Sequence, residues 1–378
     1  MQKSVNIASV GVVSALGTDA PANLQSLCGG HSGLTKVDGR CEGRVALSDD
    51  DMRRLTLCPK VQSRTTLLAL TAVLEAVAPI QTLLPQAMLI SATTVGGMDC
   101  TPIFYSPFRQ GLASRLRYVG EHEASSHTEA IARRLGIQSF RTTISTACSS
   151  GANAIMLGAR LICAGLTDVV ICGGTDALCD YTRAGFGSLM ILSPEPCRPL
   201  SADRTGLNLG EAAAYVVLTS ERVSAPSVGR LVGWANANDA FHQTAMTAEG
   251  RGGALAMSSA ICMAGLSPQD ISYINLHGTA TQNNDSSELS AINTVWNGQP
   301  LPPLSSTKSL TGHTLAAAGA LEAVFCIMAL QQQMLWPNAN FTSGDVQPVL
   351  APVSAHLSYA LSNSLGFGGN CTSLVFSK

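Results

Sequence analysis

The sequence predicts an α/β protein in which helices cover both faces of a β-sheet. Several β-branched runs are apolar at every position rather than at alternate positions, which is typical of strands buried on both faces. Helical stretches lie between these runs, and two of the helices are apolar almost all round. A helix without a polar face belongs in the interior of a large protein, so we expect a layered arrangement of helices and sheet.

The predicted strands begin near the start of the chain. The first apolar run, residues 5–13, is rich in valine and leads to a glycine turn, which favours a strand over the core of a signal peptide. Six further runs are expected to form strands at residues 87–94, 168–174, 211–220, 273–277, 357–364 and 372–377.

Three long helices are predicted between these strands, at residues 61–78, 149–163 and 314–333, with Gly165 as the terminator of the second. The weakest seam is the polar segment 222–229, which contains proline and glycine. It would divide the chain into a larger first half and a smaller second half.

The composition narrows the function classes. Of 378 residues, 46% are hydrophobic and 13% are charged, so the chain has much to bury and we expect it to oligomerise. The formal net charge of −2 lacks the basic excess that nucleic acid binding needs. We find no run of 18 apolar residues and expect no membrane span. The 12 cysteines include no C-x-x-C pair, which argues against zinc and disulfides and favours a cytoplasmic compartment.

Cys148 is the best candidate for a nucleophile. A β-compatible run, residues 142–145, leads into a turn of small residues, and the predicted helix of residues 149–163 follows directly. We therefore expect Cys148 at a helix N-terminus, where unpaired N–H groups and the helix dipole should lower the thiol pKa. A thiolate is the attacking species in acyl transfer. The alternative for any one cysteine is a small buried hydrophobic residue.

His277 is the second candidate. The predicted strand of residues 273–277 delivers it at the C-terminal end, where open α/β sheets hold their ligands. The hydroxyls of Thr279 and Thr281 follow and leave room for an extended polar ligand. The alternative is a hydrogen-bonded core histidine.

His313 opens the predicted helix of residues 314–333. Lys308 precedes it and Glu322 follows it, both in apolar surroundings. Unpaired buried charges are costly, so these two residues need partners, either as a structural ion pair or as a support for His313.

A glycine-rich turn, residues 366–369, lies between the last two predicted strands. Glycines allow a tight turn and a close approach of backbone to a ligand, so Gly368 and Gly369 are candidate substrate-binding positions. A backbone N–H in this turn could donate to an oxyanion. The alternative is an ordinary glycine-rich hairpin.

The order of these motifs resembles the β-ketoacyl-[acyl carrier protein] synthases of fatty-acid and type II polyketide assembly. The motifs are T-A-C-S-S-G around Cys148, H-G-T-A-T from His277, S-T-K-S-L-T-G-H up to His313 and G-F-G-G from Gly366. Further matches at residues 172–178, 198–206, 210–218 and 239–245 extend the resemblance over essentially the whole chain.

The resemblance implies a thiolase-like αβαβα fold made of two similar halves, residues 1–225 and 226–378, and an obligate dimer. It also implies that an acyl group passes from the phosphopantetheine arm of an acyl carrier protein to Cys148, while the N–H groups of Cys148 and Phe367 hold the oxyanion. His277 and His313 then hold a malonyl thioester as it loses carbon dioxide, and the resulting enolate extends the acyl chain by two carbons. No bound cofactor is implied.

Further roles come only from the resemblance. It matches positions of the family's supporting network (Lys308, Glu322), of its pantetheine contacts (Thr279, Thr281), of its gating aromatic residue (Phe367) and of its structural acids (Asp285, Glu288). Carrier proteins are acidic, so we expect a basic docking patch, with Arg53, Arg54, Lys60 and Arg64 as candidates and Arg204 after them.

Other functions stay open. A chain-length factor would shape a partner's pocket without catalysis, although such subunits usually replace the nucleophile. A thiolase would need a second reactive cysteine, for which Cys371 is the candidate, and a synthase that starts chains from acyl-CoA would carry Asn in place of His313. Residues 206–214 lack an aromatic residue and a glycine common in the family. Fatty-acid, polyketide and aryl-polyene chains therefore stay open as products, as do a homodimer and a heterodimer with a chain-length factor.

Overall fold

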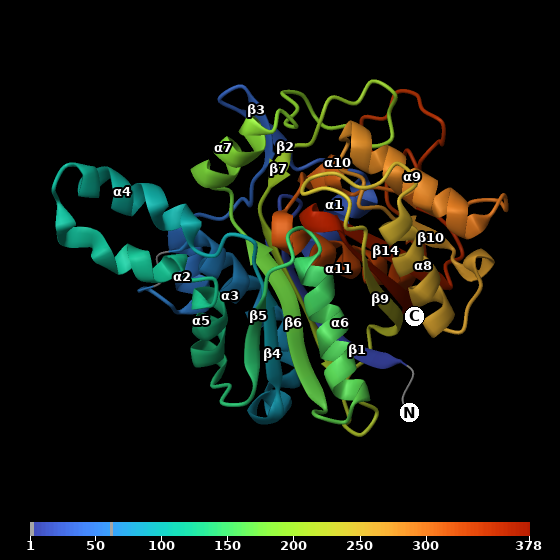
Figure 1. The fold of residues 1–378 in the computed structure, drawn as a ribbon. Helices are drawn as coiled ribbons and strands as arrows, with labels where there is room; N and C mark the ends of the chain where they lie inside the picture. The colour runs from blue at the N-terminus through green and yellow to red at the C-terminus, as the bar shows by residue number, and fades with distance from the viewer. Residues whose placement is uncertain (1–3, 61–62) are drawn as a thin grey trace.

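The computed structural model describes residues 4–60 and 63–378 and contains one ten-stranded β-sheet (Figure 1). Its strands are, in spatial order, β11 (Leu304–Ser305), β10 (Tyr273–Asn275), β14 (Tyr359–Gly366), β15 (Asn370–Ser377), β9 (Gly229–Asn238), β1 (Val5–Val13), β8 (Ala212–Thr219), β6 (Val169–Asp176), β4 (Met88–Ala92) and β5 (Arg141–Ile144). Strands β6 and β8 are buried at every residue, as their uninterrupted apolar runs predict.

The sheet consists of two halves with the same strand order. In the first half, β1, β8 and β6 are antiparallel neighbours, and β4 and β5 continue in parallel from β6. In the second half, β9, β15 and β14 are antiparallel neighbours, and β10 and β11 continue in parallel from β14. The halves meet where β1 pairs with β9. Two similar halves are therefore confirmed, whereas the boundary between residues 225 and 226, which falls in the connection from β8 to β9, stays a prediction.

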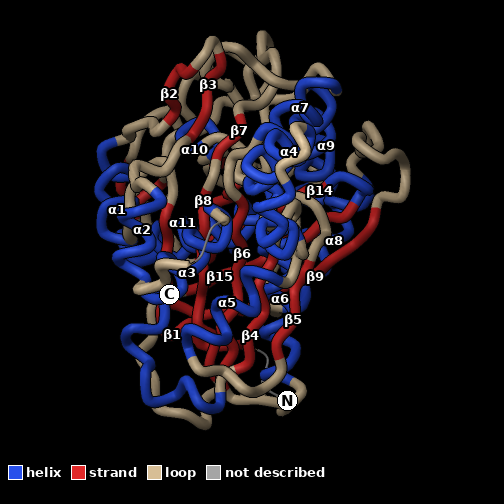
Figure 2. The backbone as a smooth tube through the Cα atoms, turned by 90° about the vertical axis from the view of Figure 1, so that its left-hand side faces the viewer, coloured by secondary structure: helices blue, strands red, loops and turns tan. Residues whose placement is uncertain are grey.

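Helices form three layers, one outside each half-sheet and one between them (Figure 1). Figure 2 faces the layer outside the first half. Helices α3 (Arg64–Val77) and α5 (Ser126–Leu135) cover the outer face of the first half. Helices α8 (Arg251–Met263) and α9 (Gln282–Trp296) cover the outer face of the second half. Helices α6 (Ser150–Cys163) and α11 (Ala318–Gln332) lie between the halves and contact strands of both. The predicted αβαβα layering is thereby confirmed.

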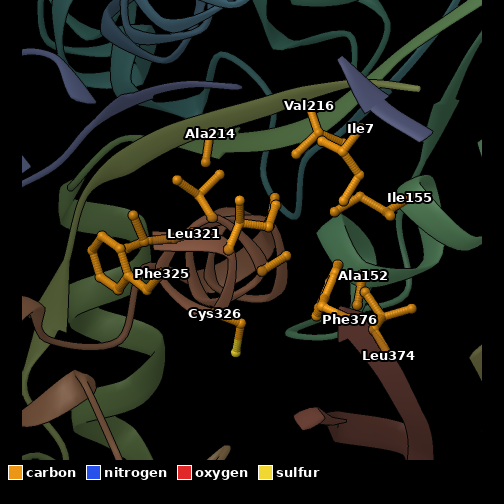
Figure 3. Packing of buried hydrophobic residues seen from close by; sticks show 14 of the residues in the cluster. Ile7, Ala152, Ile155, Ala214, Val216, Leu321, Phe325, Cys326, Leu374 and Phe376 are labelled. Carbon is orange, nitrogen blue, oxygen red and sulfur yellow. The ribbon is translucent and has the colours of Figure 1, made fainter. Parts of the chain in front are cut away.

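The two central helices pack closely because their contact consists of small residues. A Cβ on Gly151 of α6 would lie 2.7 Å from the carbonyl oxygen of Ala316, and one on Gly319 of α11 would lie 2.8 Å from the backbone nitrogen of Ala152. Around them, α11 contributes Leu321 and Phe325 to a cluster with side chains of both half-sheets, among them Val216 and Phe376 (Figure 3). Burial on all sides explains why α11 carries no polar face, whereas α6 exposes Arg160.

The seven predicted strands correspond to β1, β4, β6, β8, β10, β14 and β15. The helix predicted at residues 61–78 begins at Arg64, because the Ser63 hydroxyl accepts the N–H of Thr66 as an N-cap, and residues 61–62 lie outside the described part. The helix predicted from residue 314 starts as a 3₁₀ turn, Leu315–Ala317, before α11. Strand β9 was not predicted; it begins at the end of the segment 222–229, which was expected to be a seam.

The remaining elements are short and lie around this core. The helices are α1 (Ala20–Gly29), α2 (Asp49–Thr56), α4 (Thr101–Arg109), α7 (Asp180–Ser188) and α10 (Lys308–Thr311), with 3₁₀ segments at Ala78–Gln86, Met98–Cys100, Ala113–His122, Pro268–Asp270 and Phe367–Gly369. Strands β2 (Leu34–Val37), β3 (Arg40–Gly43) and β7 (Leu209–Gly210) form one small sheet, and β12 (Met334–Leu335) and β13 (Val353–Ser354) form another.

Two helical stretches, Arg64–Gln86 and Leu315–Gln332, are long and apolar enough to cross a membrane by length and composition. The second is 89% buried inside the protein and the first 50% buried. Neither stretch is an unbroken run of 18 apolar residues, because Glu75 interrupts the first and Glu322 the second. Burial explains the apolar composition of the second: a helix enclosed by two half-sheets is as apolar as one enclosed by lipid.

Candidate active site

Cys148 lies in the turn between β5 and α6, as predicted. Ala147 precedes it with φ +54°, a left-handed conformation that a non-glycine residue adopts only when its surroundings enforce it. Ser149 is the N-cap residue of α6. Cys148 is 5% exposed, so a substrate can reach its sulfur only through a pocket.

Burial raises the pKa of the Cys148 thiol to about 11. The charge of Lys308 and the backbone N–H groups of Phe367 and Cys148 act in the opposite direction, and the carboxylate of Asp176 adds to the rise. The prediction of a lowered thiol pKa is therefore wrong. Loss of water around a fully enclosed sulfur outweighs the helix N-terminus, so the resting residue is a thiol and needs a base beside it.

His313 lies beside the Cys148 sulfur and can act as this base. Its Nε2 lies 3.0 Å from the sulfur of Cys148. The backbone of His313 is held by its N–H, which donates to the carbonyl of Asn208 at 2.7 Å, and by its carbonyl, which accepts the N–H of Gly210 at 3.0 Å. The preceding Gly312 has φ +72° and would contact Leu209 if it carried a Cβ. The sequence places a glycine where this chain reversal needs one.

His277 completes the constellation from the end of β10. Its ring centroid lies 5.4 Å from that of His313, with the two planes at 89°. Its backbone N–H donates to Oε1 of Glu288 at 2.8 Å, and the N–H of Gly278 donates to Oε2 at 2.8 Å. Glu288 therefore orients the turn that carries the imidazole, as a structural acid would.

Lys308 and Glu322 form a buried pair behind His277. The Lys308 Nζ donates to the His277 carbonyl at 2.6 Å, approaches His277 Nδ1 at 3.3 Å and contacts Glu322 Oε1. An ammonium has no lone pair to offer, so it can only donate to Nδ1, and the proton of the neutral imidazole then lies on Nε2. The pair thus sets the tautomer of His277.

Both imidazoles are neutral. Burial lowers the pKa of His277 well below its ordinary value, and the charge of Lys308 and the neighbouring His313 add to this effect. Burial and Lys308 likewise lower the pKa of His313. Burial raises the pKa of Glu322 to about 7 against the charge of Lys308. Burial also raises the pKa of Glu288 to about 7, against the two backbone N–H groups that it accepts.

The glycine-rich turn lies opposite the sulfur. The Phe367 N–H acts on the Cys148 sulfur as a hydrogen-bond donor, which lowers the thiol pKa. The Phe367 ring stacks on Phe186 of α7, with centroids 5.8 Å apart and planes at 19°. Gly368 and Gly369 have φ +82° and +83°, which only glycine adopts without strain. Sequence reasoning missed Phe186, although its Gly-Phe-Gly context at residues 185–187 repeats that of residues 366–368.

A pocket of about 290 Å³ that opens to the surface is lined by Cys148, His277, His313, Phe186 and Phe367. Gly368 and Gly369, predicted to bind substrate, are absent from its wall. Thr279 and Thr281 lie in its wall with their hydroxyls 3.0 Å apart, as predicted for a polar ligand. Asp285 lies behind this wall and accepts the N–H groups of Ala280 and Leu200. Among the described residues that line the pocket, none is Lys, Arg, Asp or Glu. Residues that sequence reasoning did not single out are Leu189, Met190, Thr205, Thr244, Met246 and Asn283.

The predicted docking arginines have other partners. Arg64 is 20% exposed and donates to Glu211, to Asp49 and to two backbone carbonyls. Arg204 is 10% exposed and donates to the carbonyls of Thr281 and Gln282, which form the pocket wall. Both side chains therefore make contacts within the protein, and their role in carrier docking stays a prediction.

The other candidates lie near an acidic helix start. Arg53 pairs with Asp50 at 2.7 Å, and Arg54, which is 78% exposed, pairs with Asp51 at 3.3 Å. Three aspartates, residues 49–51, form the first turn of α2, as suits a helix N-terminus. Lys60 is exposed at the surface. The three aspartates balance Arg53, Arg54 and Lys60 in charge, and the role of these basic residues in carrier docking stays a prediction.

The Cys148 sulfur and one nitrogen each of His277 and His313 lie within 4.8 Å of one another, a set that could hold a metal ion. Such a site needs lone pairs on the coordinating nitrogens. Lys308 directs the His277 proton onto Nε2 and adds a positive charge nearby. The electrostatics of the site therefore favour an electron-rich oxygen over a cation.

Comparisons with known proteins agree with this geometry. Residues 107–224 match the beta-ketoacyl synthase N-terminal domain, and residues 228–342 match the C-terminal domain. The 3-oxoacyl-[acyl-carrier-protein] synthase 2 of Vibrio cholerae is 37% identical over 262 residues, 64% of this chain and 63% of the relative. That of Staphylococcus aureus is 37% identical over 249 residues, 62% of this chain and 60% of the relative. The chain thus spans about six tenths of these curated relatives.

Solved structures extend the match to the full chain. A chain from the structure of the ketosynthase ApeO in complex with its chain length factor ApeC, from Xenorhabdus doucetiae, is 33% identical with a TM-score of 0.86, and the match covers 99% of this chain and 98% of that one. The ishigamide ketosynthase/chain length factor aligns over 100% of both chains with 27% identity and a TM-score of 0.90. On these matches, the chain belongs to the β-ketoacyl synthase family.

Proposed function

We propose that this chain is a β-ketoacyl-[acyl-carrier-protein] synthase, an acyltransferase that extends an acyl chain by two carbons through decarboxylative condensation. The observation that carries the proposal is the 3.0 Å contact between His313 Nε2 and the Cys148 sulfur, with the neutral His277 beside it. A nucleophile, its proton acceptor and a neutral N–H donor thus share one water-poor pocket.

In the first half-reaction, the Cys148 sulfur attacks the thioester carbonyl of an acyl group on the carrier's phosphopantetheine. The thiol proton moves to His313 Nε2, and the N–H groups of Cys148 and Phe367 receive the oxyanion. Because the thiol pKa is raised and the imidazole pKa is lowered, we expect proton transfer to accompany the attack rather than precede it. The carbon–sulfur bond to the carrier then breaks, and the imidazole returns the proton to the leaving thiolate.

In the second half-reaction, a malonyl thioester occupies the emptied pocket. His277 Nε2–H donates to its carbonyl oxygen, and His313, in the tautomer with a proton on Nε2, donates from the other side. The bond to the carboxylate breaks, carbon dioxide leaves, and its electron pair forms an enolate that two uncharged donors stabilise. The enolate carbon attacks the acyl carbonyl carbon, and the carbon–sulfur bond breaks to leave a Cys148 thiolate. The Nε2 proton of His313 passes to this thiolate while water supplies a proton to Nδ1, which restores the tautomer of the first half-reaction.

The partners follow from this chemistry. An acyl carrier protein supplies both thioesters, and we expect Thr279 and Thr281 to contact its pantetheine arm, so that no resident cofactor is needed. A second ketosynthase-like chain, identical or a chain-length factor, is supported by an arm formed by α4 and the following 3₁₀ segment, which projects from the body (Figure 1). Its exposed apolar side chains are Ile103, Tyr105, Phe108, Leu112, Leu116 and Val119. We place the protein in the cytoplasm, in keeping with its 12 free cysteines.

The alternatives have less support. A chain-length factor has no need of Cys148, His277 and His313 in contact. A thiolase would need Cys371 in the pocket, but this residue is fully buried beside the sulfur of Met246 at 3.6 Å and is absent from the pocket wall.

The test is mass spectrometry of the protein after exposure to an acyl-carrier thioester. We expect one acyl group on Cys148, its loss in Cys148→Ala, and its retention in the control Cys371→Ala. Addition of malonyl carrier should release the label as a β-ketoacyl carrier two carbons longer. A parent protein that stays unmodified, or that carries the label on another cysteine, would refute the proposal.

A further inference from the structure

A cluster of three amides lies directly behind Cys148 and takes no part in the chemistry described above. It consists of Asn153 on α6, Asn236 on β9 and Asn370 on β15, and we call it the asparagine cluster. These residues lie on three elements, and 217 positions separate Asn153 from Asn370. The cluster therefore joins the nucleophile turn to the strand that follows the glycine-rich turn.

Asn370 is the centre of this cluster. Its Oδ1 accepts Nδ2 of Asn153 at 2.9 Å, Nδ2 of Asn236 at 2.8 Å and the hydroxyl of Ser149 at 2.6 Å. Ser149 directly follows Cys148, and Phe367 lies three residues before Asn370. The side-chain oxygen of Asn370 thus links Ser149, the residue after the nucleophile, to β15. This strand begins three residues after Phe367, the proposed second oxyanion donor.

A second set of hydrogen bonds ties the other side of the nucleophile. The Asn153 Nδ2 also donates to the hydroxyl of Thr146 at 2.8 Å, two residues before Cys148. The Thr372 hydroxyl donates to Asn153 Oδ1 at 2.8 Å and accepts Nδ2 of Asn236 at 2.8 Å. The residues on both sides of Cys148 are therefore linked to β15 by hydrogen bonds. Ser149 is linked directly through Asn370, and Thr146 is linked through Asn153.

The turn that carries Cys148 and the glycine-rich turn of residues 366–369 pack closely against each other. A Cβ on Gly366 would lie 2.9 Å from the Thr146 carbonyl oxygen and 3.1 Å from the Ser149 hydroxyl. Between these two residues, Ala147 keeps its left-handed backbone. A strained backbone persists only where its surroundings over-determine it, and the asparagine cluster supplies polar contacts on both sides.

We propose that Asn370 is a positioning residue: through the asparagine cluster it sets the spacing between the N–H of Cys148 and the N–H of Phe367, and so the geometry of the oxyanion site. This inference rests on the proposed function and deepens it. The positioning role concerns acyl transfer alone. His277 follows β10, His313 follows α10, and neither has a hydrogen bond to the asparagine cluster among the described residues.

The experiment compares the two half-reactions in Asn370→Ala. We expect the rate of Cys148 acylation by an acyl-carrier thioester to fall about ten- to a hundred-fold, somewhat less than the loss of an oxyanion donor outright. Decarboxylation of malonyl carrier should stay within about twofold of the parent rate. Asn370→Asp should restore most of the acylation rate, because all three short contacts use Oδ1 as an acceptor. The matched control is Asn293→Ala, which removes an exposed amide on α9.

A readout independent of activity is the pH profile of Cys148 alkylation by iodoacetamide. The Phe367 N–H favours the thiolate, so its displacement in Asn370→Ala should shift the profile to higher pH. Asn236→Ala, at an exposed position of β9, should shift it in the same direction by less, and serves if Asn370→Ala fails to fold. Equal losses in both half-reactions, or an unchanged alkylation profile in both variants, would overturn the inference. If the parent catalyses neither half-reaction, the proposed function fails, and the alkylation profile still decides the positioning role.

Discussion

Replacing Lys308 by methionine tests the buried pair that supports His277. Lys308 and Glu322 are each 2% exposed, and the second carboxylate oxygen, Oε2, has no hydrogen-bond partner among the described side chains. The variant keeps most of the side-chain volume but removes the charge that faces Glu322. It also removes the donors to the His277 carbonyl and Nδ1, each worth about 1 kcal/mol at any pH.

The pH-dependent loss can be worked out from Glu322. Burial raises its pKa from 4.5 to about 7. Between these two pH values the folded protein keeps a proton that the unfolded chain has lost, so the free energy of unfolding falls as pH rises from 4.5 to about 7. Without Lys308 the pKa rises further and the window extends upward. At pH 6 the folded carboxyl is protonated in parent and variant alike. At pH 8.5 only the variant keeps the proton, which costs it about 2 kcal/mol more, at about 1.36 kcal/mol per unit of pKa.

The assay is chemical denaturation followed by the fluorescence of the buried tryptophans, at pH 6 and pH 8.5, for the parent and Lys308→Met. The same substitution in a Glu322→Gln background is the control, since no carboxyl titrates there and the loss should be equal at both pH values. A loss from Lys308→Met that does not grow with pH would refute this account of the pair.

Three further outcomes are expected. The rate of Cys148 alkylation by iodoacetamide should rise about tenfold per pH unit from pH 7 to 10, because the thiol pKa is raised to about 11, and a plateau below pH 9 would contradict this. Arg64→Ala should lower stability by about 3–5 kcal/mol in thermal denaturation, because the buried carboxylate of Glu211 loses its partner, and KM for the acyl carrier should not change. The control Arg54→Ala removes an exposed ion pair and should change stability by less than about 0.5 kcal/mol. Gly366→Ala should slow acylation at least about tenfold, since its Cβ would meet the nucleophile turn. The control Gly253→Ala on α8, whose Cβ would lie no closer than 3.4 Å to its neighbours, should keep parental rates.

Local patterns account for most of what sequence reasoning predicted correctly. Strands β6 and β8 could be predicted because burial on both faces requires an apolar residue at every position. Cys148, His277 and His313 could be singled out because each stands where a strand or a glycine turn passes into a helix or loop, and such junctions are encoded by neighbouring residues. The prediction that Lys308 and Glu322 need partners followed from the cost of burying any unpaired charge.

The sequence by itself therefore determined a layered α/β fold, because hydrophobic periodicity is local. Its short motifs determined the family, which implies the αβαβα architecture, and the three residues of the reactive constellation. Only the tertiary structure decided the direction of the Cys148 pKa, since enclosure by distant elements outweighs a local helix end. It also decided that Arg64 lies within an ion-pair network with Glu211, 147 positions away, and that Asn370 meets Asn153 behind the nucleophile. Contacts across such separations depend on how strands are ordered in space, which no local pattern in the chain records.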